Sequence, residues 1–276
     1  MSPVTPEESK ALKSLESDLD SFREKLEKVD YSKDEKAFFT LMQEFWAFIS
    51  WFTDERLYSI FEHSQYFALY QNFFSKNEEF YVRALETVES LSVLTNKDWK
   101  NISFYDKFTL QNPKEVYKQT WIEIWMLDLE DAHTLVMVGC WPLPETILFY
   151  YENTLIDTIV ALDNNQEAVV MAGKLIRSQS LNRIKTIRID GTHYDYKDAD
   201  IICLANFVSP KSKVFDQIAK TAKVNVQIVT RTPILFWRML YEDTVNALNS
   251  RLAVVKESPV NPFFLAKTLL IKKLDI

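Results

Sequence analysis

The placement of glycine and proline limits what the first part of this chain can fold into. Neither residue occurs between Glu7 and Asn112. The whole chain holds three glycines, all in the second half: Gly139, Gly173 and Gly191. A long stretch without turn and breaker residues favours long helices. The sequence therefore predicts a helical first part, followed by a part that is organised differently.

Capping signals and apolar periodicity locate the helices. Thr5–Glu8 is typical of a capping box with Pro6 at the first helical position, and apolar residues then recur every three or four positions. Ser32–Glu35 is a second predicted capping box, which opens a helix rich in aromatic residues. Further helices are expected over about 65–93 and over Pro113–Met126. Aromatic residues in such a pattern more often pack in a hydrophobic core than form a cage around a ligand, so we expect a core role for them.

Composition excludes several classes of function. The net charge of −7 and the pI of about 5.2 give the chain no bulk attraction for nucleic acid or an anionic membrane. Two cysteines and three histidines are too few and too scattered for a zinc motif or a disulfide framework. The N-terminus lacks the features of a signal peptide, and the apolar stretch 37–52 is too short to span a bilayer. We therefore expect a cytoplasmic protein with no protein-bound metal, no nucleic-acid partner and no membrane segment.

The pattern changes near Ala132, where short apolar runs begin to alternate with helical patterns. Alternation of this kind predicts a mostly parallel, doubly wound sheet of the α/β class. A further apolar segment, 265–271, is expected as a strand at or near the sheet edge, where an antiparallel direction is also possible. We place an all-α helical domain at 1–128 and a Rossmann-like domain at 129–276. The runs expected as parallel strands are 133–138, 158–162, 184–189, 201–204 and 224–229.

Ligands of open parallel sheets bind beyond the carboxyl ends of the strands. Here the residues at those positions are Gly139–Pro144, Asp163, Asp190 and Asn206. Gly139 allows a close backbone approach, but the chain has no GxGxxG fingerprint and no Walker A loop, which argues against a pyrophosphate. Acids after two strands suit the hydroxyl and amino groups of a nucleoside, as in S-adenosylmethionine sites of class I methyltransferase-type folds. Acidic residues also end many strands simply as turn formers.

Residues 139–147, Gly-Cys-Trp-Pro-Leu-Pro-Glu-Thr-Ile, resemble the Gly-x-Gly-Pro-Leu-Pro-Leu-Thr loop of nicotianamine synthases. Asp163 matches the second acid of that family's acidic-x-acidic-Pro turn, and Asp190 precedes Asp200 by the family's spacing. Residues 230–232 and 238–241 resemble its Tyr-Arg-Thr and Arg-Ala-Ile-Leu-Tyr segments. The resemblance covers roughly the last half of the chain, and the N-terminal helices match in character only.

The resemblance implies a class I methyltransferase-type domain behind a helical lid. It also implies transfer of the 3-amino-3-carboxypropyl group of S-adenosylmethionine to a small-molecule amine or amino-acid acceptor, with release of methylthioadenosine. Such transfer builds metallophores, and a homodimer is compatible with it. The residues expected to bind the co-substrate are Gly139, Trp141, Pro142, Leu143, Asp163, Asp190 and Asn206.

The chain departs from the family at three positions. Trp141 replaces the second glycine of the loop, and Ala161 replaces the first acid after the second strand. The family's catalytic glutamate aligns with Phe80; Glu79 is adjacent, but one helical step turns a side chain by about 100°. Tyr117 matches a tyrosine that lines the acceptor site. The expected catalytic residues are therefore Tyr117 and Glu79, and for Glu79 a solvated helix face is the competing interpretation.

Three alternatives stay open at this point. Loss of the glutamate favours an azetidine-2-carboxylate synthase, which cyclises S-adenosylmethionine on itself and needs no outside acceptor. A conventional methyltransferase would use the same fold. Trp141 and Ala161 also leave room for a non-catalytic module that only binds S-adenosylmethionine.

Overall fold

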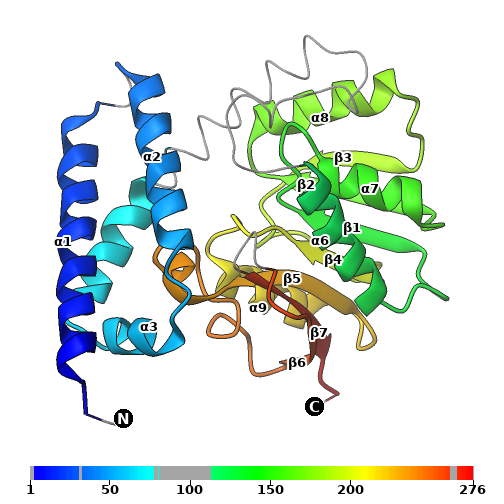
Figure 1. Cartoon of the computed structure of the whole chain (residues 1–276). Coiled ribbons are helices and arrows are strands. Elements are labelled where there is room, and N and C mark those ends of the chain that lie inside the picture. Colours follow the sequence, from blue (N-terminus) through cyan, green and yellow to red (C-terminus); the bar gives the residue numbers. More distant parts are fainter. Residues whose placement is uncertain (1–2, 31–32, 78–79, 81–112, 262–265, 276) are drawn as a thin grey trace. The chain divides into compact units, whose positions relative to one another are not determined.

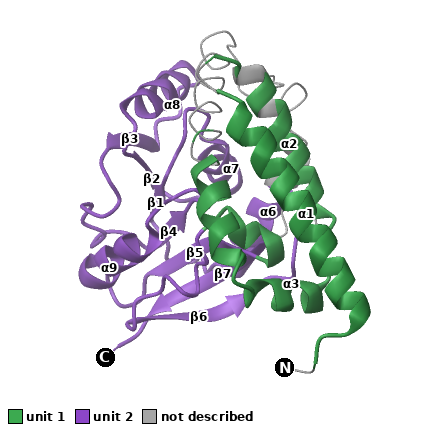
Figure 2. Cartoon of the chain, turned by 90° about the vertical axis from the view of Figure 1, so that its left-hand side faces the viewer, with its two compact units in different colours: residues 1–85, 234–241 green, residues 86–233, 242–276 purple. Residues whose placement is uncertain are grey.

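The computed structural model describes residues 3–30, 33–77, 80, 113–261 and 266–275 (Figure 1). The chain packs as two compact units (Figure 2). The helical unit comprises Met1–Leu85 and Ile234–Tyr241, and the sheet unit comprises Glu86–Pro233 and Glu242–Ile276. These packing units differ from the sequence-based division at 128, which remains a proposal about the roles of the two parts.

Helix α1, Pro6–Lys28, begins at the predicted capping box. The Thr5 hydroxyl accepts from the backbone N–H of Glu8 at 3.2 Å, and the Glu8 carboxylate accepts from the N–H of Thr5 at 2.7 Å. Two backbone donors at the helix N-terminus are thus satisfied reciprocally. The first capping prediction is confirmed.

The second capping prediction is wrong by two residues. Helix α2, Glu35–Ser50, has Asp34 as its N-cap, and the Asp34 carboxylate accepts from the N–H of Ala37 at 3.0 Å. An aspartate is favoured there because its negative charge lies at the positive end of the helix dipole. Helix α3, Glu55–Glu62, is capped by Asp54 in a similar way.

Residues 67–77 are helical, inside the span expected at 65–93. The rest of that span lies outside the described residues, apart from Phe80, which is helical. Across the described part of the chain, no helix has the length and apolarity needed to cross a membrane.

The core of the helical unit is completed by a segment from far along the chain. The 3-10 helix η2, Leu235–Met239, contributes Phe236, whose ring lies 5.5 Å from that of Phe61, and Trp237, whose ring lies 5.7 Å from that of Trp46. The Gln71 side chain donates to the backbone carbonyl of Arg238 at 2.9 Å. Nothing in the sequence of the first part signals this contribution.

The sheet unit contains a seven-stranded sheet in the order β3-β2-β1-β4-β5-β7-β6. The strands β1 to β5 are parallel, and β7 runs antiparallel between β5 and β6. This order confirms the Rossmann-like, class I methyltransferase-type α/β fold. The strands are β1 Thr134–Val138, β2 Thr158–Asp163, β3 Ile184–Arg188, β4 Ile201–Leu204, β5 Gln227–Pro233, β6 Leu252–Glu257 and β7 Ala266–Lys273.

Helices cover both faces of the sheet. Helix α9, Lys211–Thr221, packs Val214, Phe215 and Ile218 against alternate residues of β1, β2, β4 and β5. Helix α7, Glu145–Asn153, follows β1 and packs against β2. Helix α8, Gln166–Ser178, follows β2 and packs against β2 and β3. Helix α6, Pro113–Met126, packs against α7 and β7, as its position before β1 allows.

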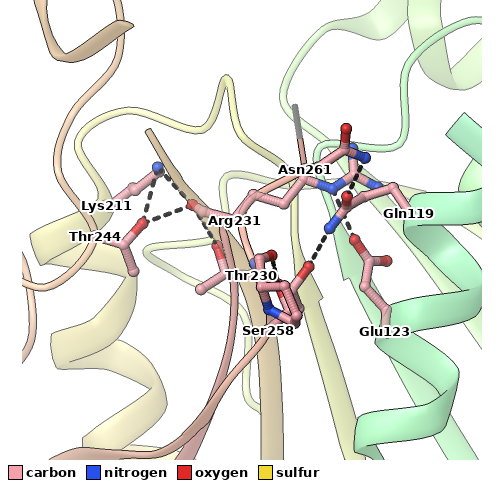
Figure 3. A network of polar contacts seen from close by, with 10 residues as sticks. Gln119, Glu123, Lys211, Thr230, Arg231, Thr244, Ser258 and Asn261 are labelled. Carbon is pink, nitrogen blue, oxygen red and sulfur yellow. Dashed lines mark hydrogen bonds and ion pairs between the residues drawn. The ribbon is translucent and has the colours of Figure 1, made fainter. Parts of the chain in front are cut away.

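A polar network fastens α6 to the sheet (Figure 3). The Arg231 guanidinium of β5 donates through Nε to the buried Glu123 carboxylate of α6 at 2.7 Å. Gln119, one turn earlier, donates to the Thr268 hydroxyl of β7 and accepts from the Asn261 amide at 2.7 Å. Burial of these groups is tolerated because each has a partner.

Lys211 is fully buried at the start of α9 and holds the two points where the chain leaves and re-enters the sheet unit (Figure 3). Its ammonium donates to the carbonyl of Arg231 at 3.5 Å, before the excursion through η2, and to the carbonyl of Glu242 and the hydroxyl of Thr244 after it, both at 3.1 Å. Burial lowers the pKa of Lys211 from 10.5 to about 8, although Glu242 and Asp243 oppose this shift.

The shift makes stability depend on pH in a defined window. Between pH 8 and 10.5 the unfolded chain holds a proton on this amine that the folded chain has released. The free energy of unfolding therefore rises with pH there, by on the order of 3 kcal/mol across the window. Urea unfolding from pH 7 to 10.5 should show this rise in the wild-type chain and not in Lys211→Met.

The exposed Lys220 of the same helix supplies the matched control, and Lys220→Met should follow the wild type at every pH. The free-energy difference between wild type and Lys211→Met should grow as the pH rises. A difference that stays constant from pH 7 to 10.5 would contradict the assigned titration.

Candidate functional site

Strand register brings the predicted binding residues to one edge of the sheet. Val138, the last residue of β1, pairs with Leu162 of β2 and Leu204 of β4. Gly139, the last β2 residue Asp163 and the residues after β4 therefore lie side by side at the carboxyl ends of three adjacent strands. Asp190 follows β3, the next strand over. The strand-end positions that the sequence singled out are thus neighbours, with the loop after β1 at their centre.

The loop 139–144 is anchored to the end of β2. The backbone N–H groups of Gly139 and Cys140 donate to the carbonyl of Leu162 at 2.9 and 3.0 Å. Gly139 has a φ of +81°, and a side chain there would place its Cβ 3.0 Å from Val208 Cγ2 and 3.1 Å from Ala205 Cβ. Glycine is required because the loop turns in the left-handed region and touches the loop after β4.

Asp163 is buried and holds the loop after β1 in place. One carboxylate oxygen accepts from the N–H of Trp141 at 3.1 Å, and the other accepts from the N–H of Asn165 at 3.0 Å. Burial raises the pKa of Asp163, while hydrogen bonds from backbone N–H groups act in the opposite direction. The two oxygens keep lone pairs for further donors, so the anchoring role is compatible with the predicted contact to a ligand hydroxyl.

Asp190 lies in a tight turn and is exposed. Its Oδ1 accepts from both the N–H and the hydroxyl of Thr192 at 2.8 Å, and the backbone bond is the main reason why its pKa is lowered. The next residue, Gly191, packs so closely that a Cβ there would lie 2.7 Å from Val138 Cγ1. The turn after β3 therefore lies against the end of β1, with Asp190 ionised beside it.

Asn206 carries the clearest sign of a missing partner. Its side-chain oxygen is buried and accepts no hydrogen bond from any described residue. An unsatisfied buried acceptor costs free energy, and natural proteins rarely retain one without a reason. A ligand N–H or O–H at the carboxyl end of β4 would satisfy it.

An aromatic residue that the sequence reasoning missed lies next to Asn206. The ring of Phe207 is 4.9 Å from that of Trp141, with the ring planes tilted by 47°. Only its position in the sequence could have indicated Phe207, because it directly follows the predicted strand-end residue Asn206. The two rings join the loops after β1 and β4.

The rest of the Pro-Leu-Pro segment leads into α7. Pro142 and Leu143 are buried, and the helix begins at Glu145 without a side-chain cap at Pro144. The N–H of Glu145 in the first turn donates to the backbone carbonyl of Leu143 at 2.9 Å.

The two predicted catalytic residues differ in what the structure says of them. Tyr117 of α6 stacks on Phe149 of α7 at 5.1 Å, and burial, with the charges of Glu145 and Glu152, raises the pKa of its phenol. The hydroxyl is therefore protonated at neutral pH and suited to donating a hydrogen bond. Glu79 lies outside the described residues. Among the residues that are described, no three His, Cys, Asp or Glu side chains gather as a metal site.

No protein-family model matches the chain, and no curated protein matches it either. Among solved structures it is similar to MtNAS, a nicotianamine synthase. A glutamate-to-glutamine variant of MtNAS in complex with S-adenosylmethionine has a TM-score of 0.73 at 15% identity, with 93% of this chain and 96% of that chain covered.

The same variant described without S-adenosylmethionine gives a TM-score of 0.73 at 15% identity, over 99% and 100% of the two chains. MtNAS in complex with MTA and tNA gives 0.70 at 16% identity, over 96% and 97%. Likeness at this identity establishes the fold. The fold implied by the sequence resemblance is therefore confirmed, and it extends over the helical part that sequence matched only in character.

Asp163→Ala tests the anchoring of the loop. The N–H groups of Trp141 and Asn165 would lose their acceptor, and we expect the free energy of unfolding to fall by about 1 to 3 kcal/mol. Asp190→Ala is the matched control, because that side chain is exposed and its bonds among the described residues lie within its own turn, so its loss should stay below about 1 kcal/mol. Equal losses in denaturant titrations of the two variants would argue against the anchor.

Proposed function

We propose that the chain is a nicotianamine synthase-like transferase. It binds S-adenosylmethionine at the carboxyl edge of β1 to β4 and moves the 3-amino-3-carboxypropyl group to a small amine or amino-acid acceptor. The observation that carries the proposal is the strand-end site. There the buried oxygen of Asn206, just beyond β4, accepts from none of the described residues, and the neighbouring Phe207 contacts Trp141 of the loop after β1. The likeness to MtNAS along nearly the whole chain supports it.

Each strand-end residue has a role in this proposal. The Gly139–Leu143 loop lies along the co-substrate, with its shape fixed by Asp163. Asp163 and the exposed Asp190 accept from the hydroxyl and amino groups of the adenosine moiety. Asn206 accepts from a ligand donor, the ammonium of the methionyl part being the strongest available.

The reaction needs little covalent chemistry from the protein. A neutral amine attacks the methylene carbon that joins the aminocarboxypropyl group to sulfur, so that a C–N bond forms as this C–S bond breaks. The electron pair of the broken bond stays on sulfur, which gives neutral methylthioadenosine, and the amine nitrogen loses a proton. The sulfonium activates three carbons alike, so the outcome depends on which one faces the amine.

The proton must go to a base. Tyr117 does not supply one at neutral pH, because the raised pKa of its phenol keeps it protonated. Its hydroxyl is instead proposed to orient the acceptor. Glu79 remains a proposed base, and the segment 1–128 is proposed to supply the acceptor side of the site. A metallophore precursor made in the cytoplasm is the product class that the resemblance suggests.

A second candidate reaction is favoured by Phe80, which occupies the position of the family's glutamate. In azetidine-2-carboxylate synthesis, the amino group of S-adenosylmethionine attacks the methylene carbon of its own chain. The ring closes, methylthioadenosine leaves and the ammonium proton passes to solvent. This reaction needs neither an outside acceptor nor a site for one.

Mass spectrometry of the purified chain with S-adenosylmethionine tests the proposal. We expect methylthioadenosine together with a new aminobutyrate-bearing product when histidine or another amino acid is added. Methylthioadenosine without an added acceptor, accompanied by azetidine-2-carboxylate, would identify the cyclisation instead. S-adenosylhomocysteine would make the chain a methyltransferase, and binding without any product would make it a non-catalytic module.

Asn206→Ala tests the binding site independently of turnover. Loss of one acceptor to a charged or polar donor should weaken S-adenosylmethionine binding by roughly 10-fold, as measured by calorimetry. Asn246→Ala, at an exposed position in the sheet unit, should bind as the wild type does. Unchanged affinity in Asn206→Ala would remove Asn206 from the site.

A further inference from the structure

Trp141 has a backbone conformation that a large L-residue rarely adopts. Its φ is +64°, in the left-handed region, where a bulky side chain is strained by on the order of 1 kcal/mol or more. The carboxylate of Asp163 accepts from its N–H and so holds it there. Strain of this kind persists where the surroundings enforce it, and it concentrates at functional sites.

The strained backbone directs the indole onto the neighbouring loop. The Trp141 ring lies 4.9 Å from that of Phe207 at a tilt of 47°, and both side chains are partly exposed. The two loops also touch at Gly139, where a Cβ would meet Val208 and Ala205. The ring pair is therefore a fixed feature of the edge between β1 and β4.

The surroundings of the rings decide what they can hold. Phe207 directly follows Asn206, whose buried oxygen accepts from no donor in the described part of the chain. Asp163, the acid at the end of β2, accepts from the backbone N–H groups of Trp141 and Asn165. A cation placed at the two rings meets their π faces. A sulfonium suits such a place, because it carries a positive charge but no N–H or O–H to donate.

We propose that Trp141 and Phe207 form an aromatic platform for the sulfonium of bound S-adenosylmethionine, and that this platform makes the site select the cationic substrate over neutral thioethers. The inference rests on the proposed function and adds a specificity-determining role for both residues. It also gives the tryptophan a function at a position where the resembling loops have glycine.

The platform has a consequence for turnover. Transfer leaves the bonding electron pair on sulfur, so methylthioadenosine is neutral and loses the attraction to the rings. The same two residues that favour substrate binding therefore favour product release. The expected selectivity for charge is about 3- to 30-fold, the range of a cation–π contact from exposed to desolvated sites.

The test compares two ligands that differ at sulfur. Calorimetry on the full chain would measure the dissociation constants of S-adenosylmethionine and of S-adenosylhomocysteine, a neutral thioether with the same adenosyl and amino-acid parts. We expect the wild type to prefer the sulfonium. Trp141→Leu and Phe207→Leu keep apolar bulk without a π face, and each should reduce the preference about 3- to 30-fold.

Two further variants separate the charge effect from misfolding. Trp141→Phe keeps a π face and should retain most of the preference. Trp125→Leu removes an exposed tryptophan of α6 and should leave both dissociation constants unchanged. A wild type without preference for the sulfonium, or leucine variants that keep the wild-type ratio, would overturn the platform.

The same measurements distinguish failure of the platform from failure of the proposed function. If both ligands bind and the leucine substitutions do not change the ratio of their dissociation constants, the platform is contradicted and the proposed binding site is not. A charge preference that depends on Trp141 and Phe207, in a chain that yields S-adenosylhomocysteine as product, supports the platform. It contradicts the proposed transfer of the 3-amino-3-carboxypropyl group. A wild type that binds neither ligand overturns both.

Discussion

The architecture of the site depends on one set of backbone hydrogen bonds at the end of β2. The carbonyl of Leu162 accepts from Gly139 and Cys140, and the carboxylate of Asp163 accepts from Trp141 and Asn165. These bonds turn the chain sharply between β1 and α7 in the middle of the sheet. They fix the left-handed residues of the loop, and through them the direction of the indole. A buried acid is tolerated next to an apolar strand because its carboxylate accepts from the N–H groups of Trp141 and Asn165.

The parallel strands β1, β2 and β4 were predicted to within one or two residues because strands that are buried along their length form continuous apolar runs. The strand β3 was also predicted to within one residue, although most of its residues are partly or fully exposed. The same rule explains the errors. The run expected at 224–229 includes Val224, which is 49% exposed in a turn, and β5 begins only at Gln227. The strand β6 was not predicted: its apolar run is short, because the charged residues Lys256 and Glu257 end it, and only Leu252 is buried.

The candidate site was located from the sequence by position, whereas its internal arrangement was not. The strand-end rule places Gly139, Asp163, Asp190 and Asn206 together whatever their contacts are. That Asp163 binds the loop backbone follows from the φ angle of Trp141, which no side-chain pattern encodes. Phe207 was overlooked for a related reason: a ring acquires a role from the partner it meets in space, and its partner lies on the loop after β1.

The segment through η2 shows why the helical part is not a separate module defined by the first residues alone. Phe236 and Trp237 fill the aromatic core of the helical unit, yet they follow β5 in the chain. Lys211 ties the carbonyl before this excursion to the residues after it. The aromatic core around Phe61 and Trp46 is therefore built from two parts of the chain that the strands β1 to β5 separate in sequence, and a cut after the first helices would leave this core without Phe236 and Trp237.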